Sequence, residues 1–250
     1  MLCKVRGGPS DRLAKRPLSN AADNEPETIQ HSVMPKWAKT IIAVVLLPFC
    51  FGAAKALWLV LRATGKADTF WVAMLAGAAC WIVIFLLLPK PMRLYIFGHE
   101  LTHAIWTWLF GGSVKRFKVG PSGGHVVITK SNFVIALAPY FFPLYVVLLV
   151  LGFGLGHLIW DWTRYLVWFH LLVGAAYAFH LTLTWHILQT RQSDLTQHGY
   201  LFSAVVIFLG NVTVLLVGIP LLTKQAGLLT SLGWWLKSTG EILHRLRYLF

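Results

Sequence analysis

One short segment of this sequence has residue types and spacing that could bind a metal: His99-Glu100-Leu101-Thr102-His103. On a helix, residues four apart share a face, so the two imidazoles can converge on one point while Glu100, about 100° around the axis, reaches a water bound there. Catalytic zinc takes three protein ligands and leaves the fourth position to a water, whose pKa it lowers towards about 7. The glutamate can then take the water's proton and pass it to a leaving amine. The segment therefore predicts metal-assisted hydrolysis.

The surroundings of the segment strengthen this prediction. The spacing alone would arise by chance on the order of once in a hundred sequences of this composition. Glu100, however, is the only acidic residue between Thr69 and Trp160, and it lies in an apolar, aromatic stretch where a charge is costly. The alternative is a polar helix-packing cluster in which Glu100 pairs with a lysine or hydrogen-bonds across helices.

A third metal ligand must come from elsewhere, and few carboxylates are available. Between Ala67 and Gly240 the only others are Asp68, Asp161 and Asp194. Asp161 lies among tryptophans in a loop that suits the lipid headgroups, whereas Asp194 lies between two apolar stretches and can face a bundle interior. We therefore predict Asp194 as the third ligand.

Histidines are the competing candidates for this third position. The alternatives to Asp194 are His125, His186 and His198. His170, His180 and His186 are spaced ten and six apart and so lie on different helical faces. We expect these three to act mainly as hydrogen-bond donors in helix packing.

The elements that would position these residues are membrane helices. The chain has 250 residues, of which 57% are hydrophobic and only 12% charged, a composition outside the soluble globular range. Five apolar stretches reach the roughly 20 residues that a helix needs to cross the bilayer. They cover residues 41–61, 69–88, 132–155, 165–188 and 199–222. We therefore predict an all-α polytopic membrane protein.

Three further elements are expected around these spans. The metal segment falls in a predicted helix over 92–110, which starts after a proline-flanked break and ends at Gly111-Gly112. If this helix crossed the membrane, the later spans would place Asp194 on the opposite side, so we favour a re-entrant helix. Residues 113–131 predict a β-hairpin around a glycine-rich turn. Residues 224–250 predict an amphipathic helix in the membrane surface.

The predicted organisation is a basic, largely disordered cytosolic tail over 1–39, a membrane-embedded domain over 40–223 and the surface helix over 224–250. The net charge of +13 gathers in the tail, the loops and the C-terminal segment. Lipid headgroups are therefore the expected anionic partner, and nucleic acid is not expected. The Lys and Arg distribution favours a cytosolic N-terminus; no oligomeric state is predicted.

The residues around the metal segment resemble the site-2 protease family of intramembrane zinc metallopeptidases, in particular its compact bacterial members. The resemblance covers about residues 97–211. The run from Phe97 to Ala104 is similar to the family's first metal motif, and Gly111-Gly112 with the following turn is similar to its hairpin. Ser193-Asp194 stands where relatives carry the third-ligand aspartate.

The resemblance implies that His99, His103 and Asp194 bind Zn²⁺ and that Glu100 is the base. Three positions depart from the family pattern. Leu195 replaces a glycine that often follows the aspartate, and Pro139 and Phe142 stand where smaller residues are common.

The function that the resemblance implies is a zinc metalloendopeptidase of a bacterial inner (plasma) membrane. It would cut a peptide bond in or near a transmembrane segment of another membrane protein. Separately, the strand pattern of the hairpin and its place directly after the motif helix suggest that its exposed edge pairs with the unwound substrate; the alternative is that the hairpin only caps the bundle. One alternative is a non-catalytic member of the same fold that binds metal or client helices. A second alternative is a small transporter whose intramembrane histidines relay protons.

Overall fold

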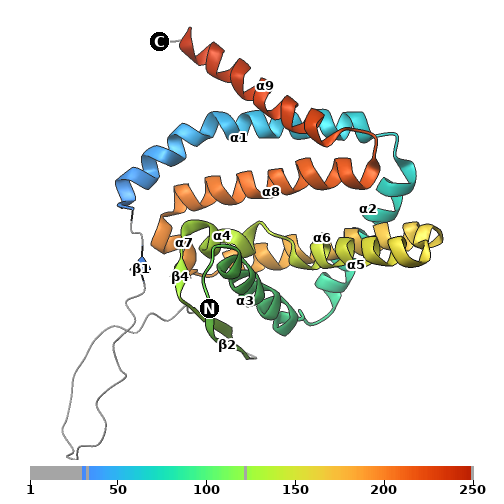
Figure 1. Ribbon diagram of the computed structural model, residues 1–250, viewed down its shortest axis with the longest axis horizontal. Helices are drawn as coiled ribbons and strands as arrows, with labels where there is room; N and C mark the ends of the chain where they lie inside the picture. Colours follow the sequence, from blue (N-terminus) through green and yellow to red (C-terminus); the bar gives the residue numbers. More distant parts are fainter. Residues whose placement is uncertain (1–29, 32–33, 121–122, 249–250) are drawn as a thin grey trace, which may run out of the picture.

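The computed structural model describes residues 30–31, 34–120 and 123–248, and it is mostly helical (Figure 1). Four segments are long and apolar enough to cross a membrane, and a bent pair of helices makes a fifth candidate. The four are α1 (Lys36–Thr64), α2 (Asp68–Leu87), the segment Trp162–Leu188, and α8 (Tyr200–Thr223). The prediction of an all-α polytopic membrane protein is confirmed.

The apolar composition explains why these segments are helical. In hydrocarbon a helix satisfies its backbone N–H and C=O groups within one segment, so long apolar runs fold in this way. The third segment consists of a 3-10 turn, η2 (Trp162–Tyr165), and α6 (Leu166–Leu188). Three of the helices, α1, α3 (Met92–Leu109) and α5 (Leu144–Trp160), follow a proline directly, since proline fits the start of a helix.

Side-chain contacts show that α2 and α6 run in the same direction. The rings of Phe70 and His170, near the start of each helix, have centroids 5.0 Å apart. Further along both helices, the rings of Trp81 and Phe179 are again 5.0 Å apart. The two helices are therefore parallel and end at the same end of the bundle.

Helix α5 runs against α6. Tyr145 at the start of α5 packs on Phe179 near the end of α6, and Phe153 further along α5 stacks on Phe169 near its beginning. The end of α2 and the start of α5 therefore lie at one end of the bundle. The chain between them therefore leaves and returns at that end, and the re-entrant position of the motif helix in the membrane stays a prediction.

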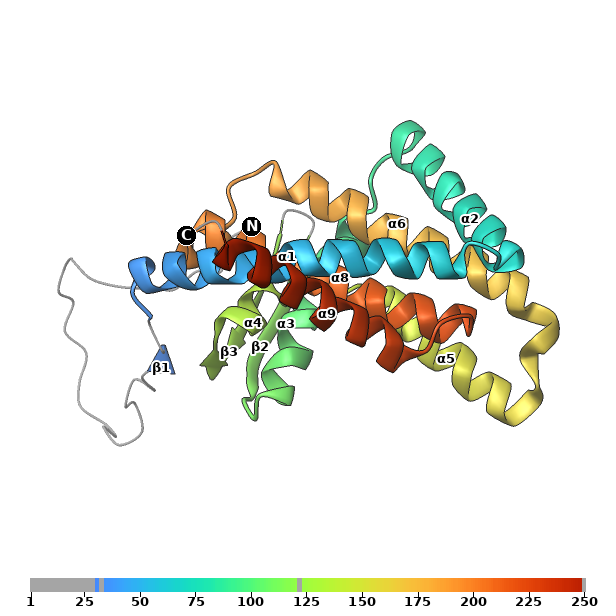
Figure 2. The same cartoon turned by 90° about the horizontal axis from the view of Figure 1, so that it is seen from above.

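The returning segment contains the metal-motif helix and the hairpin (Figure 2). Helix α3 (Met92–Leu109) is followed by Gly111, whose φ of +69° suits glycine and ends the helix. Strands β2 (Val114–Gly120) and β3 (Gly123–Ile128) pair antiparallel, with a bulge in β2. Both predictions, the helix over 92–110 and the hairpin within 113–131, are confirmed.

The stretch predicted as one span over 132–155 is divided in two. Its first part forms α4 (Phe133–Leu137) and the 3-10 turn η1 (Ala138–Tyr140), and α5 then departs at 80° to this pair. The break falls at Pro139 and Pro143, where proline removes backbone donors. The first part packs against α3 instead of continuing across the bundle.

The shorter remaining elements connect or flank the long helices. Helix α7 (Ser193–His198) joins α6 to α8, and two-residue strands β1 (Gln30–His31) and β4 (Lys130–Ser131) pair in parallel. Residues 1–29, most of the predicted tail, lie outside the described residues, and α1 begins at Lys36, within the last part of the tail predicted over 1–39. Lys39 in α1 contacts His198 in α7, with 2.8 Å between Nζ and Nδ1.

Helix α9 (Leu228–Arg247) packs across α1 and α8. It lies close to α1 at Gly52, where an added Cβ would come within 2.8 Å of the Thr239 backbone nitrogen. Lys55 of α1 pairs with Glu241 of α9 at 2.6 Å. A helix was predicted within 224–250 and is found over Leu228–Arg247, with residues 249–250 outside the described residues. Its placement in the membrane surface stays a prediction.

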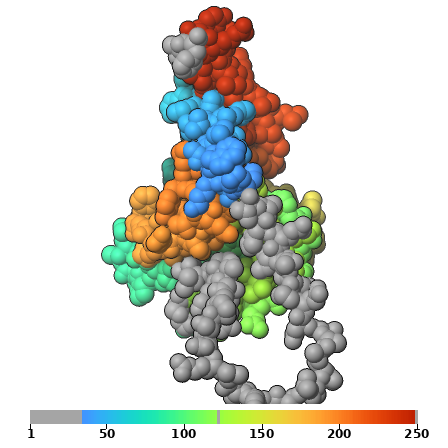
Figure 3. Space-filling model, turned by 90° about the vertical axis from the view of Figure 1, so that its left-hand side faces the viewer, coloured from blue at the N-terminus to red at the C-terminus, as the bar shows by residue number. Residues whose placement is uncertain are grey.

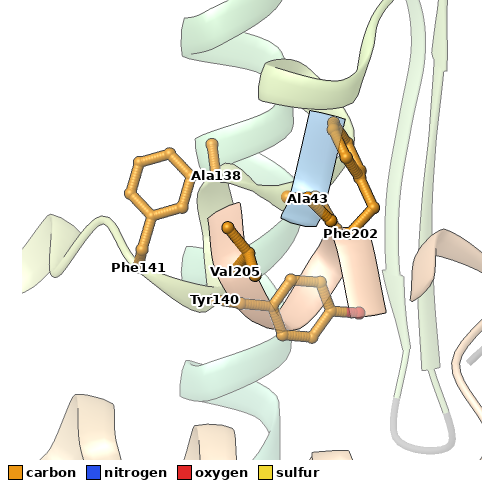
Figure 4. Close-up of a cluster of buried hydrophobic side chains, with 7 residues drawn as sticks. Ala43, Ala138, Tyr140, Phe141, Phe202 and Val205 are labelled. Carbon is orange, nitrogen blue, oxygen red and sulfur yellow. The ribbon is translucent and has the colours of Figure 1, made fainter. Parts of the chain in front are cut away.

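One buried cluster supports the site directly. It joins α1, η1 and α8 through Ala43, Tyr140, Phe202 and Val205, with the Tyr140 ring in the cluster and its hydroxyl at the edge (Figure 4). Figure 3 views this end of the molecule, where the start of α1, the region of α7 and the hairpin come together. The cluster therefore fixes η1 against the elements that carry Asp194.

Candidate metal centre

The two histidines of the motif share one buried face of α3, as their spacing predicts. His99 and His103 are 6% and 8% exposed, and their ring centroids are 5.0 Å apart. The helix is held closely on this face, because a Cβ at Gly98 would come within 2.8 Å of the Tyr145 ring. Only glycine allows this approach of α3 to α5.

Asp194 reaches the same point from α7. Its Oδ2 atom lies 3.8 Å from Nε2 of His99 and 3.8 Å from Nε2 of His103. The three donor atoms lie within 4.8 Å of one another, and no other such group occurs in the described part of the chain. The structure therefore brings together the three residues that the sequence singled out as ligands.

The Asp194 carboxylate is held by a tyrosine. The Tyr140 hydroxyl donates a hydrogen bond to Oδ2 of Asp194 at 3.0 Å, and Tyr140 is only 1% exposed. Helix α7 is fixed beside it, because the buried Gln192 side chain donates to the Ile187 carbonyl and Ser203 donates to the Leu195 carbonyl. The position of the carboxylate thus depends on η1, α6 and α8 together.

His103 is oriented by a backbone contact on the far side of its ring. Its Nδ1 lies 2.8 Å from the Ile135 carbonyl oxygen, which can only accept a hydrogen bond. Nδ1 therefore carries the proton, and Nε2, which faces Asp194, keeps a free lone pair. This is the tautomer that a metal ligand needs.

The charge of Asp194 also suits a ligand. Burial raises the pKa of its carboxyl, but the adjacent His99, His103 and Tyr140 lower it by more, and the net pKa lies below the ordinary value. The group is therefore ionised at neutral pH.

Two imidazoles and a carboxylate are donors that fit zinc. Zinc holds nitrogen and oxygen ligands at roughly 2.0–2.2 Å in a tetrahedron, so its ligands stand about 3.3–3.5 Å apart. The 3.8 Å separations are slightly wider than this and too long for hydrogen bonds. The donor atoms can close on an ion by small side-chain rotations. His99, His103 and Asp194 are therefore a candidate metal site.

Glu100 lies beside this site, under the hairpin. It is 6% exposed, interacts electrostatically with His99 and Asp194, and accepts a hydrogen bond from the backbone of Val126. The start of β3 is pressed against it, since a Cβ at Gly124 would come within 2.7 Å of its Cγ. The carboxylate thus has a fixed position between the candidate ligands and the strand.

The competing third ligands do not join the cluster. His198 contacts Lys39, and His186 packs on the Phe85 ring. His125 lies in β3 opposite Lys118. Asp161, in the loop after α5, interacts with His157 and accepts from Thr163.

The expectation is wrong for His170, because neither nitrogen of its ring has a hydrogen-bond partner in the described structure. For His180 it stays a prediction, since only Nε2 of that ring is without a partner. His170 packs instead against the rings of Phe70 and Phe169. Helical spacing locates such side chains on a face but does not supply acceptors for them.

Sequence reasoning missed the residues that support the ligands. No role was predicted for Tyr140 from the sequence, although a buried tyrosine usually needs a hydrogen-bond partner for its hydroxyl. The roles of the Ile135 carbonyl and of Gly124 have no signal in the sequence, because a carbonyl belongs to every residue and glycines are common in turns.

Comparisons with protein-family models, with curated proteins and with solved structures found no match for this chain.

Proposed function

We propose that this chain is an intramembrane zinc metalloendopeptidase of the site-2 protease type. The observation that carries the proposal is the convergence of His99, His103 and Asp194 beside a buried glutamate, within a bundle of candidate membrane spans. Burying ionisable side chains inside a membrane protein is costly, so residues of this kind usually have a function. Metal-assisted peptide hydrolysis uses all four residues.

Each residue has a role in this proposal. His99, His103 and Asp194 would hold Zn²⁺, which when bound makes water more acidic and polarises a carbonyl oxygen. Glu100 takes a proton from the attacking water as the water oxygen bonds to the carbonyl carbon of the substrate. It then delivers that proton to the amide nitrogen as the C–N bond breaks. Tyr140 and the Ile135 carbonyl keep two of the ligands in position.

The proposed substrate is a transmembrane or membrane-adjacent segment of another membrane protein. A helical peptide hides its carbonyls, so the substrate must unwind before it is cut. Strand β3 lies against α3 and beside Glu100, where an added strand would bring a peptide bond to the site. This supports substrate binding by strand pairing along the hairpin.

The location proposed is a bacterial plasma membrane with a cytosolic N-terminus. Lys39, near the start of α1, contacts α7, which carries Asp194. The site therefore lies at the end of the bundle where α1 begins, and with this orientation it would be reached from the cytosolic side. The basic residues at the ends of the chain would then contact lipid headgroups.

The test is Glu100→Gln, with Glu241→Gln as the matched control on the surface of α9. The full chain is purified in detergent for zinc analysis and also co-expressed with a panel of reporter proteins that each have one transmembrane helix. Cleavage is followed by immunoblot and mass spectrometry. We expect one zinc per chain in all three proteins and cleavage in the wild type and the control only.

The removal of a general base lowers the rate by about 10²- to 10⁴-fold. Wild-type chain without stoichiometric zinc would exclude a metalloprotease and favour the transporter alternative. Zinc in the wild type with no cleavage of any reporter would favour the non-catalytic alternative. Equal cleavage by Glu100→Gln would exclude Glu100 as the base.

A further inference from the structure

A small cavity lies beside His99. It has a volume of about 20 Å³ and is lined by residues of α3, η1, α5 and α6 and by Phe142. The polar side chains that line it are those of Tyr95, His99, Thr102, Tyr145 and His180. A space of about 10–15 Å³ with two or more polar partners is enough for one buried water.

Two of these side chains have a buried nitrogen without a partner. They are Nδ1 of His99 and Nε2 of His180, and the residues are 6% and 7% exposed. A buried polar atom left unpaired costs about 1–3 kcal/mol. The two rings are close enough to interact electrostatically. The two residues that carry these unpartnered nitrogens thus line one space, which has room for a single water.

The ligand role of His99 makes one of these nitrogens a donor. Nε2 of His99 faces Asp194 and would bind the metal, so its proton must be on Nδ1. Metal-binding histidines almost always donate this second N–H to a carboxylate, a carbonyl or water. His103 follows this rule through the Ile135 carbonyl, but His99 has no protein acceptor among the described residues.

We propose that one water in this cavity links His99 to His180, so that His180 is a positioning residue for the first metal ligand. The water accepts the proton of His99 Nδ1 and donates one of its own to Nε2 of His180. The Thr102 and Tyr145 hydroxyls already donate to the carbonyls of Gly98 and Leu94. Their oxygens can therefore accept the second proton of the water.

This inference rests on the proposed metal-binding role of His99, and its test separates the two. The variants are His180→Phe, which removes the acceptor, and His180→Gln, whose side-chain oxygen can still accept from the water. His170→Phe is the matched control. His170 is a second buried histidine of α6, is 6% exposed with both nitrogens unpartnered, and does not line the cavity.

Zinc affinity of the full chain in detergent is measured by competition with a chromophoric chelator, and the visible spectrum is recorded with Co²⁺ in place of zinc. We expect His180→Phe to weaken zinc binding about 10- to 100-fold and to change the Co²⁺ bands. We expect His180→Gln to recover most of the affinity and His170→Phe to match the wild type. Melting temperature and gel filtration establish that each variant is folded.

Wild-type affinity and spectrum in His180→Phe would overturn the water link while leaving the metal site intact. An equal loss in His170→Phe would show a general packing effect, and an equal loss in His180→Gln would exclude the acceptor role. If the wild type binds neither zinc nor cobalt, that result would instead contradict the proposed function itself. If His180→Phe does not fold, His180→Leu is judged by the same criteria.

Discussion

The hydrogen bond between Tyr140 and Asp194 allows a sharp test of how the metal centre is built. Tyr140→Phe removes the hydroxyl 3.0 Å from Oδ2 but keeps the ring, which packs in the cluster with Ala43, Phe202 and Val205. The hydroxyl that is removed is smaller than a methyl group, so the packing of η1 should not change. The change therefore acts on the carboxylate and not on the core.

The expected magnitude follows from the charge of the acceptor. A hydrogen bond to a charged group contributes about 1.5–3 kcal/mol, which corresponds to roughly 10- to 150-fold in an equilibrium constant at 1.36 kcal/mol per tenfold. Loss of a group that orients a ligand typically weakens metal binding by about 10- to 100-fold. The two estimates agree. We therefore expect Tyr140→Phe to raise the zinc Kd by about 10- to 100-fold.

The assay is chelator competition on the purified full chain, with the melting temperature of the metal-free protein measured alongside. Tyr145→Phe is the control, because this hydroxyl donates to the Leu94 carbonyl and contacts no proposed ligand. Unchanged zinc affinity in Tyr140→Phe would refute the role assigned to this hydroxyl. An equal loss in Tyr145→Phe would show that the effect is not specific to Asp194.

Three further predictions concern the hairpin, the C-terminal helix and the metal. Gly124→Ala should force β3 away from Glu100 and reduce reporter cleavage at unchanged zinc content. The control is Gly154→Ala, where an added Cβ meets open space and cleavage should be unchanged. Normal cleavage by Gly124→Ala would contradict the packing of β3 on Glu100. Gly52→Val should separate α9 from α1 near Thr239 and lower the free energy of unfolding by about 1–3 kcal/mol; calorimetry showing the wild-type melting temperature would count against the docking of α9. Treatment with a zinc chelator should abolish cleavage and added zinc should restore it, and full activity after verified zinc removal would exclude a metal mechanism.

Much of the architecture was predictable because its signals are local. Hydropathy identified the apolar stretches, and the Gly-rich turn between β-branched residues identified the hairpin. The spacing of His99 and His103 put both on one helical face. Asp194 could be selected because carboxylates are so rare in this chain that few candidates exist.

The bend in the third apolar stretch could be predicted from the sequence only in part. Pro139 and Pro143 mark a break in the sequence, but they do not specify the direction in which the chain continues. In the structure α4 and η1 turn by 80° and lie against α3, which places the Ile135 carbonyl and the Tyr140 hydroxyl at the site. That outcome depends on which surfaces pack together.

The sequence by itself thus determined the class of protein, the motif helix and the chemical types of its candidate metal ligands, because each follows from composition or from spacing along one element. The tertiary structure alone decided what surrounds those ligands. The contact of His103 with Ile135 spans 32 positions and that of Tyr140 with Asp194 spans 54. His180 enters the cavity beside His99 from another helix. Contacts of this kind arise only when separate elements pack, since no periodicity within one segment specifies the atom that a neighbouring segment presents.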